Sequence, residues 1–399
     1  MSHATRRIVL SGIQPTGGVP HLGNYLGALT NWVNMQPAAD TPDHRVFYSI
    51  VDLHAITMPQ DPATLRRNIH DMAVSLLSVG IDPDRAVLFR QSRVHLHSEL
   101  AWILFCKTPV AWLGRMHQWK TKMEAMQQQS GLQIPANATQ AEATLSLLNG
   151  TAPEQNAPSS TSSSTSDDTS AATSNLNTSG PCLGLLAYPV LQAADILLYK
   201  ATEVPIGEDQ VQHMNLAVDI ARSFNSQYKK DVFTIPRGVY ATGTAKKIMS
   251  LRVPTAKMAK SDPSDQSRIN LDDTPQEIMN KIKRATVDSI RGVTYDAVNR
   301  PGVANLLRIH AAVRAVKEPG CVESTPEGCA RVFSEYDNAQ LKKAVGECIV
   351  DGLSDVRDRM VRFKKDKAYV EEVLRKGEEK AIVAAERTMR DVKRAVGFY

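Results

Sequence analysis

A histidine, a glycine and an asparagine stand together where a short apolar strand gives way to a helix. The strand is expected at Ile8–Gly12, and Val19–Leu29, VPHLGNYLGAL, leads from its loop into the helix. Gly23 allows a ligand to approach the backbone closely, and the start of a helix attracts anions. His21 and Asn24 can donate hydrogen bonds to phosphate oxygens. The segment indicates a phosphate-binding turn, although an ordinary strand-to-helix junction would also account for it.

A second candidate is the loop Lys257–Ser261, KMAKS, which polar residues follow. Two flexible ammonium groups three positions apart can reach a polyphosphate and neutralise the charge that builds on a departing pyrophosphate. A lone pair of lysines is usually a solvated basic loop. Together, the turn and the loop favour a nucleoside triphosphate held from two sides.

The elements that must position these residues alternate between strand and helix. Strands are expected at Ile8–Gly12, Val46–Val51 and Ala86–Phe89, and helices at Gly23–Trp32 and Pro62–Val79. Such alternation predicts right-handed crossovers and a parallel sheet, whose ligands bind at the carboxyl ends of the strands. The phosphate-binding turn occupies that position.

The rest of the chain changes character twice. Residues 127–181 read as a disordered insertion, since fifteen of the thirty residues from Thr151 to Gly180 are Ser or Thr. Further elements are then expected: helices Pro189–Tyr199 and Gln210–Phe224, a loop at Glu203–Asp209, and strands Val232–Ile235 and Ile248–Leu251. After Thr274 the periodicity is helical, ending in a helix at Val370–Val396 with one apolar face. The fold class is therefore α/β, with a parallel-sheet domain followed by an α-helical domain.

Composition limits the alternatives. A chain of 399 residues is long for a single core, and a net charge of +5 suits a phosphate-bearing partner without requiring one. The five cysteines form no C-x-x-C pair, so no protein-held metal is predicted and reduced thiols in an intracellular compartment are expected. No apolar run approaches the length of a membrane span, so no membrane partner is expected.

The turn and the lysine loop resemble the signature pair of class I aminoacyl-tRNA synthetases. Four more stretches resemble the tryptophanyl-tRNA synthetases, and the likeness covers nearly all of the chain outside the insertion. These stretches are Ser11–Gly17, Asp52–Thr57, Tyr188–Tyr199 and Val204–His213. Gln192 and the run Gln210–His213 are closer to the mitochondrial form. Ala259, Asn24 and the extra Gly18 depart from the signatures, and none removes a group expected to be essential.

The resemblance implies a tryptophan pocket centred on Asp195, whose carboxylate would accept the indole N–H. A buried carboxylate left unpaired by phenylalanine is costly, which gives selectivity of ~10⁴ or more. The other positions around the amino acid are Gly12, His54, Tyr188, Gln192 and Gln210.

For ATP, the resemblance implies a binding set at both ends of the first domain. The set comprises Gln14, Pro15, Thr16, Gly23, Asn24, Gly207, Glu208, Asp209, Ile248, Lys257, Met258, Ala259, Lys260 and Ser261. The catalytic group is expected to be Lys257, Lys260, Ser261, His21 and Lys122, with Lys120 as the alternative to Lys122. The implied reaction uses ATP with Mg²⁺ as a substrate complex. The tryptophan carboxylate attacks the α-phosphorus, and tRNA(Trp) then accepts tryptophan from the adenylate. No protein base is needed, because that carboxylate is ionised at neutral pH.

The resemblance also implies a Rossmann-like catalytic domain at residues 1–265, a tRNA anticodon-binding domain at 266–399 and a homodimer. The mitochondrial matrix is the expected location and the cytoplasm the alternative, since no targeting segment is visible in the sequence. Three other functions stay open: a tyrosyl-tRNA synthetase, a synthetase-like RNA-binding protein without catalysis, and a small-metabolite adenylyltransferase.

Overall fold

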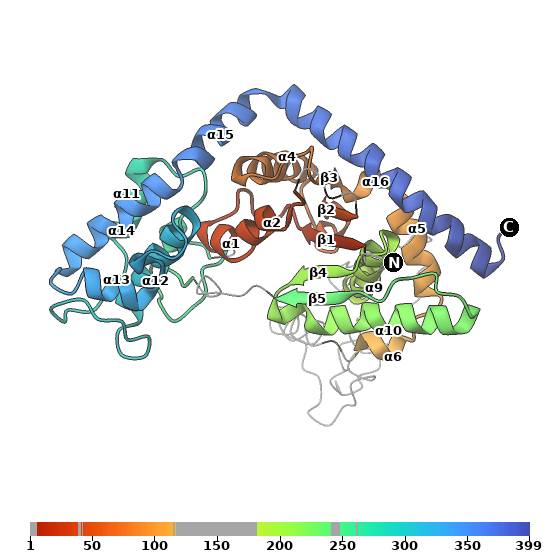
Figure 1. The fold of residues 1–399 in the computed structure, drawn as a ribbon, viewed down its shortest axis with the longest axis horizontal. Helices are drawn as coiled ribbons and strands as arrows, with labels where there is room; N and C mark the ends of the chain where they lie inside the picture. The colour runs from red at the N-terminus through yellow and green to blue at the C-terminus, as the bar shows by residue number, and fades with distance from the viewer. Residues whose placement is uncertain are drawn as a thin grey trace, which may run out of the picture.

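A five-stranded parallel sheet lies at the centre of the part of the chain that the structure describes (Figure 1). The structure is a computed structural model and describes residues 6–38, 41, 43–114, 116, 182–240, 248–260 and 262–399. The spatial order is β3-β2-β1-β4-β5. The strands are β1 (Arg7–Ile13), β2 (His44–Ile50), β3 (Val87–Arg90), β4 (Glu203–Ile206) and β5 (Arg237–Tyr240). The predicted α/β class with a parallel sheet is confirmed.

Alternate strand residues pack into two different layers. Val9 and Tyr48 face a core shared with α2 (Thr30–Met35) and α4 (Pro62–Val79). Ile8, Phe47 and Phe89 face the other core, whose helices are α5 (Leu96–Phe105), α9 (Leu183–Leu198) and α10 (Val211–Tyr228). Both faces of the sheet are therefore covered, as parallel strands with apolar residues on both sides require.

Helix α4 agrees with its predicted bounds, because both of its ends are encoded locally. The Asp61 side chain accepts a hydrogen bond from the Thr64 N–H, and Pro62 occupies the first turn. Gly80 ends the helix with φ +112°, a left-handed conformation that favours glycine. The helix expected at Gly23–Trp32 consists of α1 (Leu22–Asn24), a π-helical turn at Tyr25–Leu29 and α2.

Four local predictions in the middle of the chain differ from the structure. The segment Glu203–Asp209 is not all loop, since Glu203–Ile206 is strand β4 between β1 and β5. Val232–Ile235 is not a strand. Val232 and Phe233 are buried in the same core as α10, and the Asn225 side chain makes two hydrogen bonds with the backbone of Phe233. Their apolar character therefore reflects burial and not strand pairing. The edge strand β5 carries no comparable apolar pattern.

Ile248–Leu251 is also not a regular strand, since it makes only an isolated bridge between Met249 and Lys257. The helix expected to begin at Pro189 begins at Leu183, so that Pro189 lies inside α9. Proline usually marks a helix start, which explains why the predicted start lies too far along the chain.

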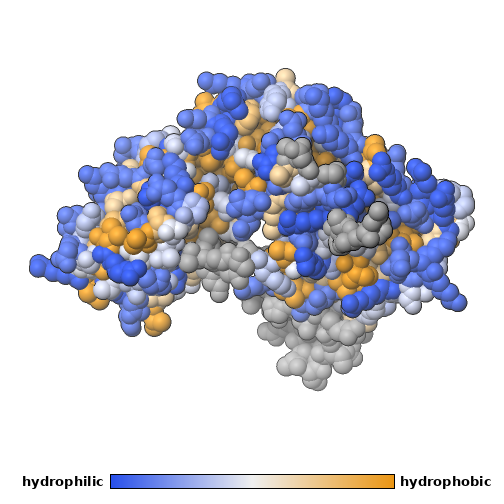
Figure 2. All heavy atoms as spheres, viewed as in Figure 1, coloured by the Kyte–Doolittle hydropathy of each residue, from blue (hydrophilic) through white to orange (hydrophobic). Residues whose placement is uncertain are grey.

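The chain after Thr274 is helical, as predicted. Its helices are α11 (Pro275–Lys283), α12 (Pro301–Lys317), α13 (Pro326–Val332), α14 (Asn338–Gly352), α15 (Ser354–Lys365) and α16 (Lys367–Val396). Helix α16 runs back along the sheet, and its second half shares a core with α5 and α9 (Figure 1). The face in Figure 2 is mostly hydrophilic, with apolar side chains gathered over α12 and α13. No helix among the described residues is both long and apolar enough to cross a membrane.

Candidate active site

The candidate site lies where the strand order reverses. The chain builds β1, β2 and β3 in one direction and then returns to place β4 on the other side of β1. The loop Gln14–Gly18 leaves the carboxyl end of β1, and Gly207 leaves that of β4. Ligands of open parallel sheets bind at such a switch point. The topology thus brings the predicted turn and the predicted 207–209 segment to the same edge.

The lysine loop reaches the turn after β1. Lys260 donates hydrogen bonds from Nζ to the carbonyl oxygens of Gly18 (2.8 Å) and Thr16 (3.3 Å). Gly17 and Gly18 have φ of +73° and +70°, a conformation that favours glycine and exposes these carbonyls to the ammonium. Burial, and then the charge of Arg268, lower the pKa of Lys260 to about 8. Lys260 is therefore in direct contact with Thr16 and Gly18, which lie 244 and 242 positions earlier in the chain.

His21 and Asn24 cap each other at the start of α1. The Asn24 N–H donates to His21 Nδ1, and the His21 N–H donates to Asn24 Oδ1, both at 3.2 Å. A Cβ on Gly23 would lie 3.0 Å from Cε1 of the imidazole, so glycine makes room for the ring. Burial, followed by the charges of Lys260, Arg268 and Lys257, lowers the pKa of His21 to about 4. The imidazole is neutral at pH 7, and because Nδ1 accepts, its proton is on Nε2.

The stem of the lysine loop is held by the helical region. The N–H of Met258, a buried residue, donates to the Ile248 carbonyl at 3.1 Å. Asn305 of α12 binds both the N–H and the carbonyl of Met249, at 2.9 and 3.0 Å. Ile248 in turn lies 3.7 Å from the position of a Cβ on Gly23. Helix α12 thereby places the loop against the turn.

Asp195 is a buried carboxylate with three side-chain donors. Oδ1 accepts from Gln91 Nε2 at 2.7 Å and contacts His97 Nδ1 at 2.6 Å, and Oδ2 contacts His54 Nε2 at 2.8 Å. Burial raises the pKa of Asp195, but the hydrogen bonds from the two histidines outweigh it and lower the pKa to about 2. An ionised carboxylate has roughly four acceptor positions. These contacts leave Asp195 able to accept one further N–H.

The other residues predicted around the amino acid form a connected polar chain. Tyr188 Oη lies 3.3 Å from His213 Nε2, and His213 Nδ1 lies 2.9 Å from Gln210 Oε1. Gln192 donates to the same Gln210 oxygen at 3.3 Å, and Gln210 donates to Asp209 at 2.9 Å. The rings of His54 and Tyr188 meet edge to face at 6.2 Å. The structure thus joins the tryptophan set to the ATP set through Asp209.

The remaining predicted residues lie on β1 and the turn after it, beside Asp209, in the lysine loop, or outside the described residues. Gly12 lies on β1, where a Cβ would be 2.8 Å from Val51, and Gln14 is exposed while Pro15 is buried. A Cβ on Gly207 would lie 2.7 Å from Asp209 Oδ1, and Glu208 stands between these two residues. Ala259 belongs to the lysine loop. Lys122, Lys120 and Ser261 lie outside the described residues.

Sequence reasoning missed two residues that bind Asp195 and one in the polar chain from Tyr188 to Gln210. Gln91 follows β3, and His97 comes from α5 and joins Asp195 to Tyr199, whose Oη lies 2.9 Å from His97 Nε2. His213 links Tyr188 to Gln210. The available signal was the position of Gln91 at the carboxyl end of a predicted strand.

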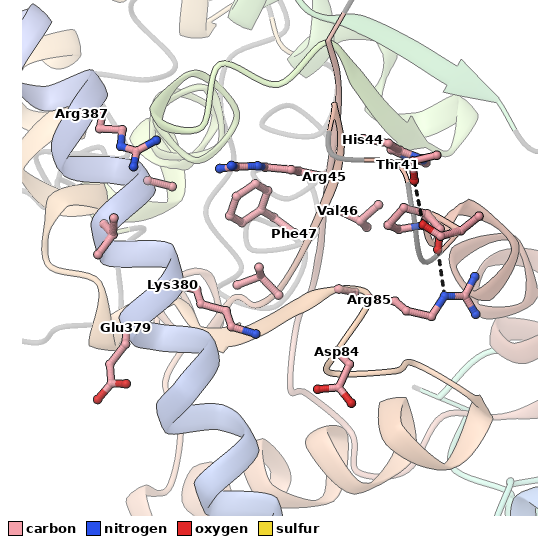
Figure 3. A pocket seen from close by; sticks show the side chains of 16 residues that line it. Thr41, His44, Arg45, Val46, Phe47, Asp84, Arg85, Glu379, Lys380 and Arg387 are labelled. Atoms are coloured by element: carbon pink, nitrogen blue, oxygen red, sulfur yellow. Dashed lines mark hydrogen bonds between the residues drawn. The ribbon is translucent and has the colours of Figure 1, made fainter.

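A cavity of about 930 Å³ lies at the opposite edge of the sheet (Figure 3). It is lined by the first residues of β2, including Arg45 and Phe47, and by Lys380 and Arg387 of α16. It shares no residue with the candidate site, so we assign the site from the converging polar groups and not from cavity volume.

Comparison with known proteins identifies the family. A family model described as class I tRNA synthetases (W and Y) matches residues 2–136 and 162–354. The mitochondrial tryptophan–tRNA ligase of Schizosaccharomyces pombe is 40% identical over 391 residues, which cover 98% of this chain and 95% of that protein. The chain belongs to the tryptophan–tRNA ligases. These are class I aminoacyl-tRNA synthetases, which activate tryptophan with ATP and transfer it to tRNA(Trp).

Other tryptophan–tRNA ligases agree in sequence and fold. That of Rickettsia conorii is 37% identical over 396 residues, 98% of this chain and 99% of its own. The tryptophanyl-tRNA synthetase of Mycoplasma pneumoniae superposes with a TM-score of 0.73 at 30% identity over 98% of each chain. That of Campylobacter jejuni, crystallised with ADP and tryptophan, has a TM-score of 0.70 at 25% identity, covering 98% of this chain and 99% of its own. The predicted resemblance and Rossmann-like fold are confirmed.

Tryptophan–tRNA ligases use ATP as a substrate. No group of three or more His, Cys, Asp or Glu side chains is arranged to hold a metal ion within the residues that the structure describes.

Proposed function

We propose that this chain activates L-tryptophan with ATP to tryptophanyl-adenylate, transfers tryptophan to tRNA(Trp), and releases pyrophosphate and AMP. The observation that supports this most directly is the contact of Lys260 with the Gly18 and Thr16 carbonyls. It joins the lysine loop to the turn after β1, so that one nucleotide can contact both. Family membership supports the reaction, and this contact supports the turn and the lysine loop as the ATP site.

Tryptophan is recognised at Asp195. Its carboxylate is ionised, buried and held by His54, His97 and Gln91, so the acceptor is already oriented before the substrate arrives. An aromatic amino acid whose side chain has no hydrogen-bond donor would bury this carboxylate with one acceptor position unsatisfied. Sites of this kind reject such analogues by ~10⁴ or more.

ATP is held between the turn and the lysine loop. The tryptophan carboxylate attacks the α-phosphorus, an oxygen–phosphorus bond forms, and the bond to the departing pyrophosphate breaks. Lys260 and Lys257 stabilise the negative charge on the transferring phosphates, and His21 donates from Nε2. Mg²⁺ enters with ATP and leaves with pyrophosphate. The side chains supply position and charge, because the attacking carboxylate needs no base.

The helical residues 266–399 form the domain that binds the tRNA anticodon, and the catalytic residues lie within 1–265. Helix α12 supports this division of work, because Asn305 connects the helical region to the lysine loop. The mitochondrial name of one relative supports the mitochondrial matrix as the location.

The protein acts as a homodimer through a face formed by α5, α6 (Val110–Gly114) and the start of α9. Trp102, Val110 and Leu183 on these helices are 69%, 73% and 76% exposed. Large apolar side chains gathered at a surface mark an interface. The particle mass in solution tests this assignment.

The deciding experiment is ATP–pyrophosphate exchange with tryptophan, tyrosine or no amino acid. We expect exchange with tryptophan alone, and we expect Asp195→Asn to lower kcat/KM for tryptophan by ~10²-fold or more without changing the KM for ATP. Asp391→Asn makes the same chemical change at a half-buried position of α16, away from the candidate site, and is the control. Exchange with tyrosine, or none at all, would overturn the proposal.

A further inference from the structure

The last residue of β3 is joined to helix α16 by a network of three hydrogen bonds. Arg90 donates from Nε to Glu378 Oε1 at 2.5 Å, and from Nη1 and Nη2 to the two oxygens of Glu371 at 3.0 and 2.6 Å. Glu371 and Glu378 are seven positions apart and therefore lie on one face of the helix. The guanidinium makes a two-pronged contact with Glu371, which fixes its direction as well as its distance.

The helix and the strand approach each other closely at this point. A Cβ on Gly377 would lie 1.8 Å from the carbonyl oxygen of Leu88, so only glycine allows the observed contact. The side chains of Arg90 and Glu378 are 14% and 11% exposed. Solvent screens such an enclosed pair little, and removing one partner is far more costly than at an open surface.

Arg90 is followed directly by a residue that holds Asp195. Gln91 is fully buried, and its amide donates to Asp195 Oδ1 at 2.7 Å. Its Oε1 accepts the N–H of Leu53 at 3.1 Å, which determines that Nε2 is the end facing the carboxylate. The position of the Gln91 backbone thus sets the direction of one of the three donors on Asp195.

We propose that Arg90 is a positioning residue for tryptophan recognition, through which α16 fixes the end of β3 and so the Gln91–Asp195 hydrogen bond. The inference rests on the proposed function, since it takes Asp195 as the acceptor of the indole N–H. It assigns α16 a role in amino-acid binding although that helix contributes no side chain to the candidate site.

The test compares tryptophan and ATP binding in Arg90→Gln, Arg90→Lys and wild type. We expect Arg90→Gln to raise the tryptophan Kd roughly tenfold and to leave the KM for ATP within about twofold. Arg90→Lys keeps the charge but loses the two-pronged contact, so its effect is expected to be intermediate. Gln91→Met is expected to raise the tryptophan Kd by itself, and adding Arg90→Gln to it to cause little further change. Such non-additivity distinguishes action through Gln91 from general loosening of the fold.

Two control variants separate positioning from stability. Arg375→Gln removes contacts with Glu372 and Glu379 on the exposed face of α16, and Asp391→Asn removes the ion pair of α16 with Lys200. Both are expected to keep the wild-type tryptophan Kd. The proposal is overturned if Arg90→Gln leaves that Kd unchanged, weakens tryptophan and ATP equally, or adds fully to Gln91→Met. A wild-type protein that binds no tryptophan would instead overturn the proposed function.

Discussion

Two regions at opposite ends of the sheet, the candidate site and the cavity beside Arg45, hold their charged side chains in different ways. At the carboxyl end, Asp195 is buried and surrounded by donors, and Arg90 has a carboxylate on each side. At the amino end, Arg45 and Arg387 are exposed, extend toward one another beside a cavity of about 930 Å³ (Figure 3), and make no ion pair with any described residue.

The contrast shows that fixed partners, and not open volume, distinguish a site that can select a ligand. Groups already held in place need little reorganisation when a substrate arrives, and in a buried setting their fields are strong. Exposed guanidinium groups are hydrated and screened by salt. Function is therefore expected to depend on the candidate site and not on the cavity.

The largest effect is expected at the candidate site, from Lys260→Ala. The change removes the cation that contacts the turn after β1, and we expect adenylation to fall by ~10²–10³-fold with little change in tryptophan affinity. Pyrophosphate exchange and tryptophan binding measure the two quantities separately. Equal losses in both would mean that Lys260 holds the bound substrates and not the transition state.

The sequence was sufficient where local rules decide the structure. The cap at Asp61 and the left-handed Gly80 determine α4, and the alternation of strands and helices determines the parallel sheet. It failed where tertiary contacts override local pattern. Val232 and Phe233 look like a strand because they are apolar and buried, whereas β5 is an edge strand whose residues are exposed or half-buried.

The candidate site shows the same limit. His21, Lys260 and Asp195 were found because their neighbours in sequence form motifs. Gln91 and His97 were missed because neither belongs to a motif. Gln91 follows a predicted strand, but only the packing of β3 and α5 shows that both residues reach Asp195. Networks assembled from separate elements are visible only in three dimensions.

The pH dependence of the ATP reaction tests whether the charge of Lys260 at the candidate site is needed. Burial lowers the pKa of Lys260 to about 8, so the ammonium is charged below that pH and neutral above it. We expect kcat/KM for ATP to fall as pH rises through about 8, approaching tenfold per pH unit. Lys260→Arg retains its charge to higher pH and is expected to remove this decline. A wild-type profile that stays flat to pH 10 would show that the free enzyme does not depend on this charge.

The smallest effect is expected at the cavity, from the double variant Arg45→Gln with Arg387→Gln. Partial burial and the charges of Arg6 and Arg387 lower the pKa of Arg45, so these cations repel and removing them costs no ion pair with a described residue. We expect tryptophan-dependent exchange within about twofold of wild type, and a free energy of unfolding within about 0.5 kcal/mol of it or slightly higher. Exchange kinetics and urea denaturation measure both. A tenfold loss of exchange in a stably folded variant would contradict the role given to fixed partners. An open basic cavity would then contribute to the reaction as strongly as a buried and paired network.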